Sequence, residues 1–385
     1  MLYITYISNK MINYLMFLLI FFLKFISPHI ITLPVTSYED YRPNPLMHFI
    51  NEHYKYHVYL NTFLSRSVFG IYFREESIRS KRGNTSTIYL DDEYRVIDYS
   101  TDIQFDNAYV NDLSIYIADE IVANRIFGLA LGYHFKNESC SIVHNLYNNK
   151  YIEHRQFAFH NIKENMKGYF YIGGVPNNDH KVYKYKSAIK VNPNLPTWGF
   201  TLTDVVINNT VYHINKEAIL HSAMTRMFTS DDLYELLTTT VLKEFIERDV
   251  CRIKERSYQK YLECKEEIKD VYEEEIDFVF GKTVIQFKMK ELFDYSRHSL
   301  FSTNTPKKIH GFDGVILCVE FINKFNYTVF DYDSKQVEFY SDRIGIFEKN
   351  TSDIKNINKI IVIGVIALTL VNCLYLIYVR VNKQL

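Results

Sequence analysis

Some acidic side chains in the first third of the chain could take part in acid–base catalysis. Two carboxylates about 3 Å apart share one proton, so one can act as the acid and the other as the base. Six residues are candidates for such a pair: Glu75, Glu76, Asp91, Asp92, Asp98 and Asp102. Solvated charges on hairpins explain the same residues, and we favour that simpler interpretation. Other catalytic templates are missing from the sequence, which has no G-x-S-x-G, H-E-x-x-H or P-loop motif.

The five cysteines do not have the spacing of a metal site. Cys140, Cys251, Cys264, Cys318 and Cys373 include no C-x-x-C pair, so we expect no zinc site and no cofactor. The first four could pair in an oxidising compartment, with a connectivity that the sequence does not define. The formal net charge is −1, and it gives no indication of a nucleic-acid partner.

Strand signals dominate the elements that would position these residues. Short runs of β-branched and aromatic residues recur between turn signals, which predicts a mainly β architecture with few helices. The clearest strands are predicted at Tyr56–Leu60, Val68–Phe73, Ser86–Leu90, Leu113–Ile117, Gly168–Gly174, Phe200–Ile207 and Thr283–Met289. Residues Tyr327–Phe339 alternate, turn at Asp333-Ser334 and alternate again, as two strands of a hairpin do.

Helical spacing is confined to residues 230–275. Ser230 is a candidate N-cap, and Asp231 and Asp232 suit the positive end of a helix dipole. Apolar residues then recur at helical spacing as far as Phe245. The highly charged segment Arg252–Glu275 is predicted to form one or two solvated helices.

Apolar segments at both ends predict a single-pass type I membrane protein. Residues 1–30 contain the apolar run Met11–Ile30, which is typical of a signal peptide, or of a signal anchor if it is not cleaved. Ile360–Val379 is a run of 20 uncharged residues, long enough to span a bilayer. A polar stalk over 346–359 and a cytoplasmic tail over 380–385 flank this span, and the body would be lumenal or extracellular.

Five Asn-x-Ser/Thr sequons agree with a lumenal or extracellular body. The candidate glycosylation sites are Asn84, Asn137, Asn208, Asn326 and Asn350. Such sequons also arise by chance in a chain rich in asparagine.

Several of these segments resemble pepsin-family aspartic proteases, in the correct order along the chain. Tyr327–Phe339 resembles the family's Y-T-V-F-D-Y-D strand pair, which closes the C-terminal lobe. Upstream, six further segments are similar to family strands: Tyr59–Thr62, Ile126–Ala130, Phe170–Val175, Trp198–Leu202, Ala218–Ala223 and Gly314–Leu317. The resemblance implies a bilobal pepsin-like acid-protease fold, with an N-terminal β-lobe over 31–190, a C-terminal β-lobe over 191–345 and a peptide-binding cleft between them.

The resemblance also implies one catalytic aspartate per lobe, each in a D-T-G or D-S-G turn. Aligned on the family, Arg74 falls at the first aspartate and His221 at the second. Arginine stays protonated and cannot act as a general base, and the family's turn glycines are replaced by Glu76 and Ala223. Val96–Thr101 resembles the family's flap strand and would place Tyr99 over the cleft, although an ordinary strand tyrosine is the alternative.

The expected function is therefore that of a membrane-anchored relative of aspartic proteases that has lost catalysis. Such a protein would bind a peptide or protein ligand in the inter-lobe cleft, in the secretory pathway or at the cell surface. Two alternatives stay open at the level of sequence. The chain could be an active endopeptidase with unrecognised acids, or a surface coat or adhesin domain that uses the same scaffold.

Overall fold

The computed structural model describes most of the body of the chain. The residues described are 30–38, 42–51, 54–62, 67–69, 85–89, 93–105, 108–118, 128–134, 140–162, 167–195, 197–222, 227–256, 259–265, 275–288, 299–303 and 314–348. Within these ranges, no helix has the length and apolar character needed to cross a membrane. The predicted signal segment up to residue 29, the span Ile360–Val379 and the tail lie outside them.

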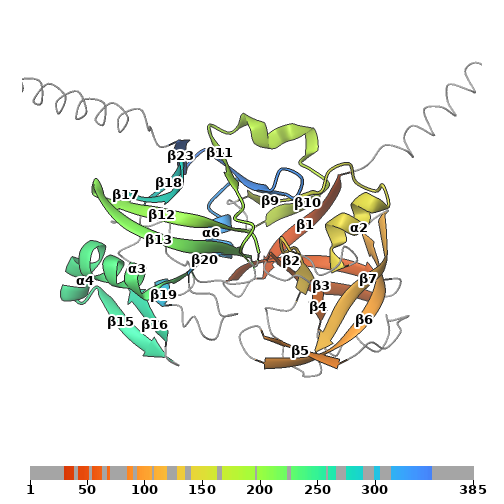
Figure 1. Ribbon diagram of the computed structural model, residues 1–385, viewed down its shortest axis with the longest axis horizontal. Coiled ribbons are helices and arrows are strands. Elements are labelled where there is room, and N and C mark those ends of the chain that lie inside the picture. The colour runs from red at the N-terminus through yellow and green to blue at the C-terminus, as the bar shows by residue number, and fades with distance from the viewer. Residues whose placement is uncertain are drawn as a thin grey trace, which may run out of the picture.

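Strands form most of the described body, as the sequence predicts, and they are arranged in two sheets (Figure 1). The first sheet has thirteen strands and contains both N-terminal and C-terminal segments. In sheet order, its strands are β11 (Tyr185–Lys190), β22 (Gln336–Ser341), β21 (Tyr327–Asp331), β9 (Gln156–Ile162), β10 (Lys167–Ile172), β1 (Ile31–Tyr38), β2 (Arg42–Asn51), β3 (Tyr54–Asn61), β8 (Gly128–Ala130), β4 (Ser67–Phe69), β7 (Ala108–Ala118), β6 (Glu93–Phe105) and β5 (Thr85–Tyr89).

The second sheet has ten strands, all from the C-terminal half. In sheet order, they are β15 (Cys251–Arg256), β16 (Gln259–Cys264), β19 (Ser299–Thr303), β14 (Met227–Thr229), β20 (Val315–Cys318), β13 (Thr210–His221), β12 (Gly199–Ile207), β17 (Glu275–Phe280), β18 (Thr283–Lys288) and β23 (Gly345–Glu348). Figure 1 shows β2–β7 on the right and β12–β20 on the left, so the two halves of the chain lie side by side.

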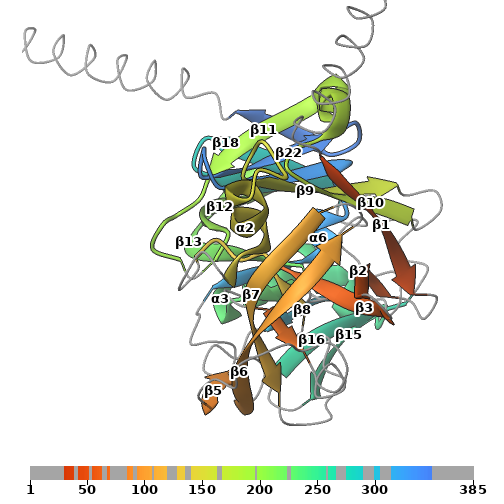
Figure 2. The same cartoon turned by 90° about the vertical axis from the view of Figure 1, so that its right-hand side faces the viewer.

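The hairpin β21–β22 joins these halves. Its strand β21 pairs with β9, with Thr328 opposite Phe159, and β22 pairs with β11. The alternation in Tyr327–Phe339 is the reason that this segment forms a hairpin, and the prediction from its sequence is confirmed. Figure 2 shows β9, β11 and β22 together in one layer, with β5 and β15 at the far end of the molecule.

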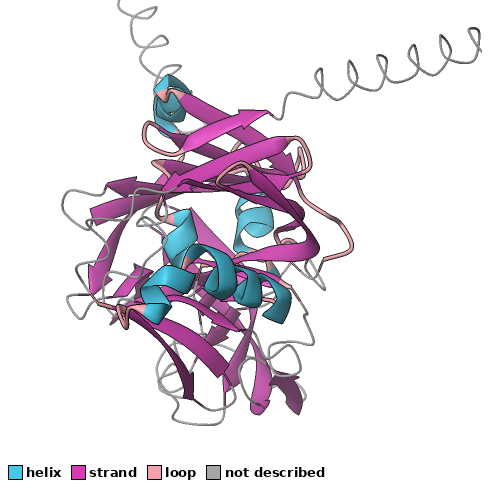
Figure 3. Cartoon of the chain, turned by 90° about the vertical axis from the view of Figure 1, so that its left-hand side faces the viewer, coloured by secondary structure: helices cyan, strands magenta, loops and turns pink. Residues whose placement is uncertain are grey.

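Helices are short and few among the strands, as Figure 3 shows. They are α2 (Ile142–Asn148), the 3-10 helix η4 (Pro176–Val182), α3 (Asp231–Leu236), the π-helical turn η5 (Leu237–Val241), α4 (Lys243–Glu247) and α6 (Val319–Ile322). The helix predicted after Ser230 is present, and Ser230 is its N-cap residue, although its side chain makes no capping hydrogen bond.

The predicted helices over Arg252–Glu275 are wrong for the residues described. Cys251–Arg256 and Gln259–Cys264 form the antiparallel hairpin β15–β16, and a disulfide joins Cys251 to Cys264. Unlike charges face one another across its two strands, with Arg252 opposite Glu263, which stabilises this pairing. The alternation of the charges with Ile253 and Leu262 was a strand signal, hidden by the high charge of the segment.

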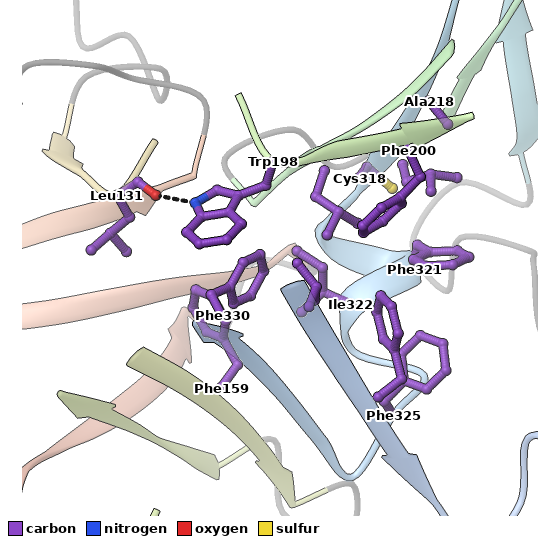
Figure 4. Packing of buried hydrophobic residues seen from close by; sticks show 14 of the residues in the cluster. Leu131, Phe159, Trp198, Phe200, Ala218, Cys318, Phe321, Ile322, Phe325 and Phe330 are labelled. Atoms are coloured by element: carbon purple, nitrogen blue, oxygen red, sulfur yellow. Dashed lines mark hydrogen bonds between the residues drawn. The ribbon is translucent and has the colours of Figure 1, made fainter. Parts of the chain in front are cut away.

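The centre of the body is an aromatic core where the halves meet (Figure 4). Trp198 is fully buried and donates a hydrogen bond from Nε1 to the carbonyl oxygen of Leu131 at 2.6 Å. Phe157 and Phe330 stack with their ring centroids 4.5 Å apart, and Phe330 meets the Trp198 ring edge-on at 5.2 Å. Burying large aromatic side chains from strands of both halves stabilises their mutual position.

Candidate functional site

The ends of β3 and β13 meet at the centre of the body, where two hydroxyl side chains form a reciprocal set of hydrogen bonds. Oγ1 of Thr62 accepts a bond from the backbone N–H of Ser222 at 3.0 Å and donates one to the carbonyl of Leu220 at 2.8 Å. In return, Oγ of Ser222 accepts from the backbone N–H of Thr62 at 2.9 Å and donates to the carbonyl of Leu60. Each hydroxyl side chain therefore binds the backbone of the opposite strand.

Both residues are fully shielded from solvent, so these bonds are the means by which two buried strand ends satisfy their polar groups. Thr197 adds a further link, since its hydroxyl donates to the carbonyl of Thr62. We call Thr62, Ser222 and the carbonyls of Leu60 and Leu220 the hydroxyl clasp. Because the two partners are 160 residues apart in sequence, the clasp holds together distant parts of the chain.

The strands around the clasp have the same arrangement in both halves. β3 runs parallel to β8, with Asn61 opposite Ala130, and β13 runs parallel to β20, with His221 opposite Cys318. Next to these, β4 lies antiparallel to β8 and parallel to β7, while β14 lies antiparallel to β20 and parallel to β19. Two copies of one four-strand motif therefore face each other through the clasp.

Comparison with protein families agrees with this internal repeat. A family model described as eukaryotic aspartyl protease matches residues 62–341, which is more than half of the chain. The chain belongs to the eukaryotic aspartyl protease family. This confirms the resemblance to pepsin-like enzymes that the sequence motifs predicted. No curated protein matches the chain in sequence.

Solved structures share the fold at low sequence identity. An aspartic proteinase from Irpex lacteus has a TM-score of 0.61 and 11% identity, covering 81% of this chain and 97% of its own. Basic 7S globulin from soybean has a TM-score of 0.63 and 12% identity, covering 82% and 95%. Conglutin gamma, a basic 7S globulin from lupine seeds, has a TM-score of 0.62 and 12% identity, with the same coverage. The fold is thus found in a proteinase and in seed globulins, and it does not by itself decide activity.

The residues that precede the two hydroxyls of the clasp are the candidates for the family's catalytic positions. In a D-T-G or D-S-G turn, the acid comes directly before the hydroxyl residue. Here Asn61 precedes Thr62 and His221 precedes Ser222. His221 is fully buried, at the end of β13, in the position predicted for it relative to Ser222.

Arg74, the residue predicted for the first catalytic position, lies outside the described residues, as do Glu75 and Glu76. The clasp points instead to Asn61, which stands before Thr62 as His221 stands before Ser222. A signal for this was present in the sequence, since Asn61-Thr62 differs from the expected Asp-Thr in a single residue type. The same two residues also fit the family strand that leads into the turn, as the segment Tyr59–Thr62 does.

The flap candidate Tyr99 lies on β6 and belongs to the main hydrophobic core, with 8% of its surface exposed. Both the flap role of Tyr99 and the alternative, an ordinary strand tyrosine, stay predictions. Its neighbour Asp98 is partly exposed and accepts a hydrogen bond from the Ser114 hydroxyl at 3.4 Å. Asp102 is part of β6, while Asp91 and Asp92 lie outside the described residues.

Two of the five sequons lie in the described part of the chain. Asn208 is exposed in the turn between β12 and β13, with a φ of 50°, so its side chain is accessible to a glycosylating enzyme. Asn326 is half-buried and accepts a hydrogen bond from the backbone N–H of Asp342 at 3.2 Å. The other three, Asn84, Asn137 and Asn350, are outside the described residues.

Metal-binding side chains do not gather in the ranges that the structure describes, where no group of three or more His, Cys, Asp or Glu residues could hold an ion. Among the four cysteines that the structure describes, Cys251 and Cys264 form a disulfide, and the side chains of Cys140 and Cys318 are buried.

Proposed function

We propose that the chain is a membrane-anchored member of the aspartyl protease family that does not hydrolyse peptides and instead binds a peptide or protein partner between its two lobes. The observation that carries this proposal is the pair of residues that precede the hydroxyl clasp. They are Asn61 and His221, where an active enzyme of the family needs two aspartates.

The chemistry of these two side chains excludes the family's mechanism. That mechanism needs one ionised carboxylate to activate water and one protonated carboxyl group to polarise the scissile carbonyl. The Asn61 carboxamide does not ionise, and the His221 imidazole becomes a cation, not an anion, when it binds a second proton. Phe63 and Ala223 also stand where the family's turns have glycine.

The hydroxyl clasp supports a binding role because it maintains the relative position of the two lobes without the acids. Four hydrogen bonds between the lobes hold β3 and β13 in one register. A rigid, preorganised pair of lobes lowers the cost of binding an extended ligand. Membrane anchoring is supported by the apolar run Ile360–Val379, and secretion by the run Met11–Ile30.

The experiment that tests the loss of catalysis is an assay of the purified full-length chain with an acid-denatured protein as substrate, between pH 3 and pH 7. We expect no cleavage above that of a His221→Ala variant purified in parallel, which serves as the control for contaminating proteases. Cleavage that disappears in the variant and is blocked by a statine-type inhibitor would establish the alternative, an active endopeptidase, and overturn the proposal.

Ligand binding is tested separately, by hydrogen exchange of the full-length chain with and without a pool of extended peptides. We expect slower exchange at the amides of residues 60–62 and 220–222 when a peptide binds between the lobes. The hairpin β15–β16 provides the internal control, because it lies at the far edge of the second sheet. Unchanged exchange at both places would favour a coat or adhesin role for the scaffold.

A further inference from the structure

One surface of the body combines an exposed apolar side chain with a cluster of lysines. It is formed by the end of η4 and the start of β11, and we call residues Lys181–Lys186 the η4–β11 surface. Val182 at its centre has 82% of its surface exposed, the largest exposure among the large hydrophobic residues described. Lys181, Lys184 and Lys186 around it are also exposed.

Aromatic rings alternate with these lysines. Tyr183 and Tyr185 are half-buried, and the ammonium group of Lys184 lies over the Tyr185 ring at 4.6 Å from its centroid. The wider segment Pro176–Lys190 contains four lysines and a single acidic residue, Asp179. The sequence Lys-Val-Tyr-Lys-Tyr-Lys thus presents positive charge and amphipathic rings together, a combination typical of protein surfaces at a membrane interface.

Protection of a sheet edge does not account for all of this surface. β11 is the terminal strand of the thirteen-stranded sheet, and lysines on a terminal strand discourage pairing with other chains. Val182, however, precedes β11 and lies in η4, where an exposed apolar side chain has no such effect. Edge protection therefore accounts for the lysines of this surface but not for the apolar side chain that lies among them.

The described part of the chain begins and ends close to this surface. Ile30 lies beside Gly174, since a Cβ atom placed on Gly174 would be 3.8 Å from the Cδ1 atom of Ile30. The helix η4 starts two residues after Gly174. At the other end, β23 lies against β11 and ends at Glu348. Figure 1 shows β23 and β11 together at the top of the molecule, and α4 well below them.

The length of the chain beyond Glu348 limits how far the body can move from an anchoring span. Only residues 349–359 separate β23 from Ile360. Even fully extended, a segment of that length reaches at most about 40 Å. If Ile360–Val379 spans the bilayer, as proposed above, the end of the body that carries β23 and the η4–β11 surface stays within that reach of the membrane.

We propose that the η4–β11 surface docks on the phospholipid headgroups of the membrane in which the chain is anchored. This inference rests on the membrane anchoring in the proposed function. Val182 would enter the interface, while the ammonium groups of the three lysines bind lipid phosphates. The body would then lie with its η4 end on the bilayer and with α4 and the hairpin β15–β16 directed away from it.

The test uses the full-length chain reconstituted in phosphatidylcholine vesicles, with and without a fifth of the lipid replaced by phosphatidylserine. In one variant, Val182→Cys carries an environment-sensitive fluorophore. In the control variant, Lys243→Cys carries the same fluorophore at a position on α4 that is also exposed but lies away from the η4–β11 surface. Both variants carry Cys373→Ser, and the buried Cys140 and Cys318 side chains are shielded from the label. Lipids with a spin-labelled headgroup quench a fluorophore that touches the interface.

We expect quenching at position 182 to exceed quenching at position 243 several-fold, and to be stronger with phosphatidylserine. Replacing Lys181, Lys184 and Lys186 by Gln lowers the docking equilibrium constant about a hundredfold, since each lysine near an anionic surface contributes about a factor of five. The same replacement at Lys243, Lys260 and Lys265, all exposed on the second sheet and α4, leaves quenching at 182 unchanged.

Equal quenching at positions 182 and 243, in vesicles from which alkaline carbonate does not extract the chain, would overturn the docking proposal and leave the anchoring intact. Extraction of the chain by alkaline carbonate would overturn the anchoring, and the docking proposal with it. Neither result affects the assay for peptidase activity, so the outcomes of the two proposals can be distinguished.

Discussion

Removing one hydroxyl group from the clasp is the most direct test of the site described above. Valine has nearly the same shape as threonine, so Thr62→Val removes the hydroxyl without leaving a cavity. In the variant, the backbone N–H of Ser222 loses its acceptor and the carbonyl of Leu220 loses its donor. Both residues are fully buried, and water cannot replace the lost partner without opening the lobes.

The magnitude follows from the two orphaned groups. A buried backbone group without a hydrogen-bond partner costs about 1–3 kcal/mol, so we expect Thr62→Val to lower the free energy of unfolding by about 3 kcal/mol. Ser222→Ala should have a similar effect, because it orphans the N–H of Thr62 and the carbonyl of Leu60. A loss of this size is a large part of the stability of an ordinary domain, about 5–15 kcal/mol.

The assay is urea unfolding of the full-length chain in detergent, followed by the fluorescence of Trp198. This is the single tryptophan of the chain, and it is buried where the halves meet. Thr32→Val, at an exposed position on β1, is the control, and it should change the free energy of unfolding by less than about 0.5 kcal/mol. A loss below about 1 kcal/mol for Thr62→Val would refute the reasoning that the clasp holds the lobes together.

Three further predictions concern activity, pH and the disulfide. The double variant Asn61→Asp, His221→Asp should remain without peptidase activity in the acid assay, because the turns still lack their glycines; activity sensitive to a statine-type inhibitor would contradict this. Burial lowers the pKa of His160, so as the pH falls through about 6.5 the unfolded chain binds a proton at this side chain before the folded protein does. Its contribution to stability is therefore complete above that pH and lost as the pH falls, and the drop in urea midpoint between pH 7.5 and pH 5 should be smaller in His160→Gln. Replacing both cysteines of the Cys251–Cys264 disulfide by Ser should lower the free energy of unfolding by about 3 kcal/mol, as expected for a cross-link over 13 residues. In the unchanged chain, peptide mapping under non-reducing conditions should recover this disulfide pair and no other.

Local patterns in the sequence predict the family and several of the strands. The strand Phe200–Ile207 alternates because one of its faces packs into the core and the other is largely half-buried. The hairpin at Tyr327–Phe339 also alternates in sequence, although every residue of its strand β21 is buried. For the charged segment after Cys251, the sequence predicts solvated helices, whereas the structure has a hairpin. Both faces of this hairpin carry charge, so its sequence shows only weakly the alternation of apolar and polar residues that indicates a strand. The facing pairs that stabilise it are formed between strands and become visible only in the structure.

The candidate site was predicted in part. His221 could be found from its own strand, since Ala218–Ala223 resembles the family segment that carries the second aspartate. For the first position the sequence offers two candidates, Arg74 and Asn61, and it does not show which residue is the partner of Ser222. Thr62 is that partner, and its hydrogen bonds cross 160 residues of sequence. The tertiary contact between the two hydroxyl groups therefore favours Asn61 over Arg74, which the local pattern alone does not do.

The hydroxyl clasp also explains how such a fold can persist without the acids of an enzyme. The bonds of Thr62 and Ser222 run to backbone groups and do not involve the side chains of Asn61 or His221. A replacement at either of those two positions changes the chemistry of the site, yet it removes none of the atoms that form the four hydrogen bonds of the clasp. Stability and catalysis therefore depend on neighbouring but separate residues, so the loss of one does not require the loss of the other.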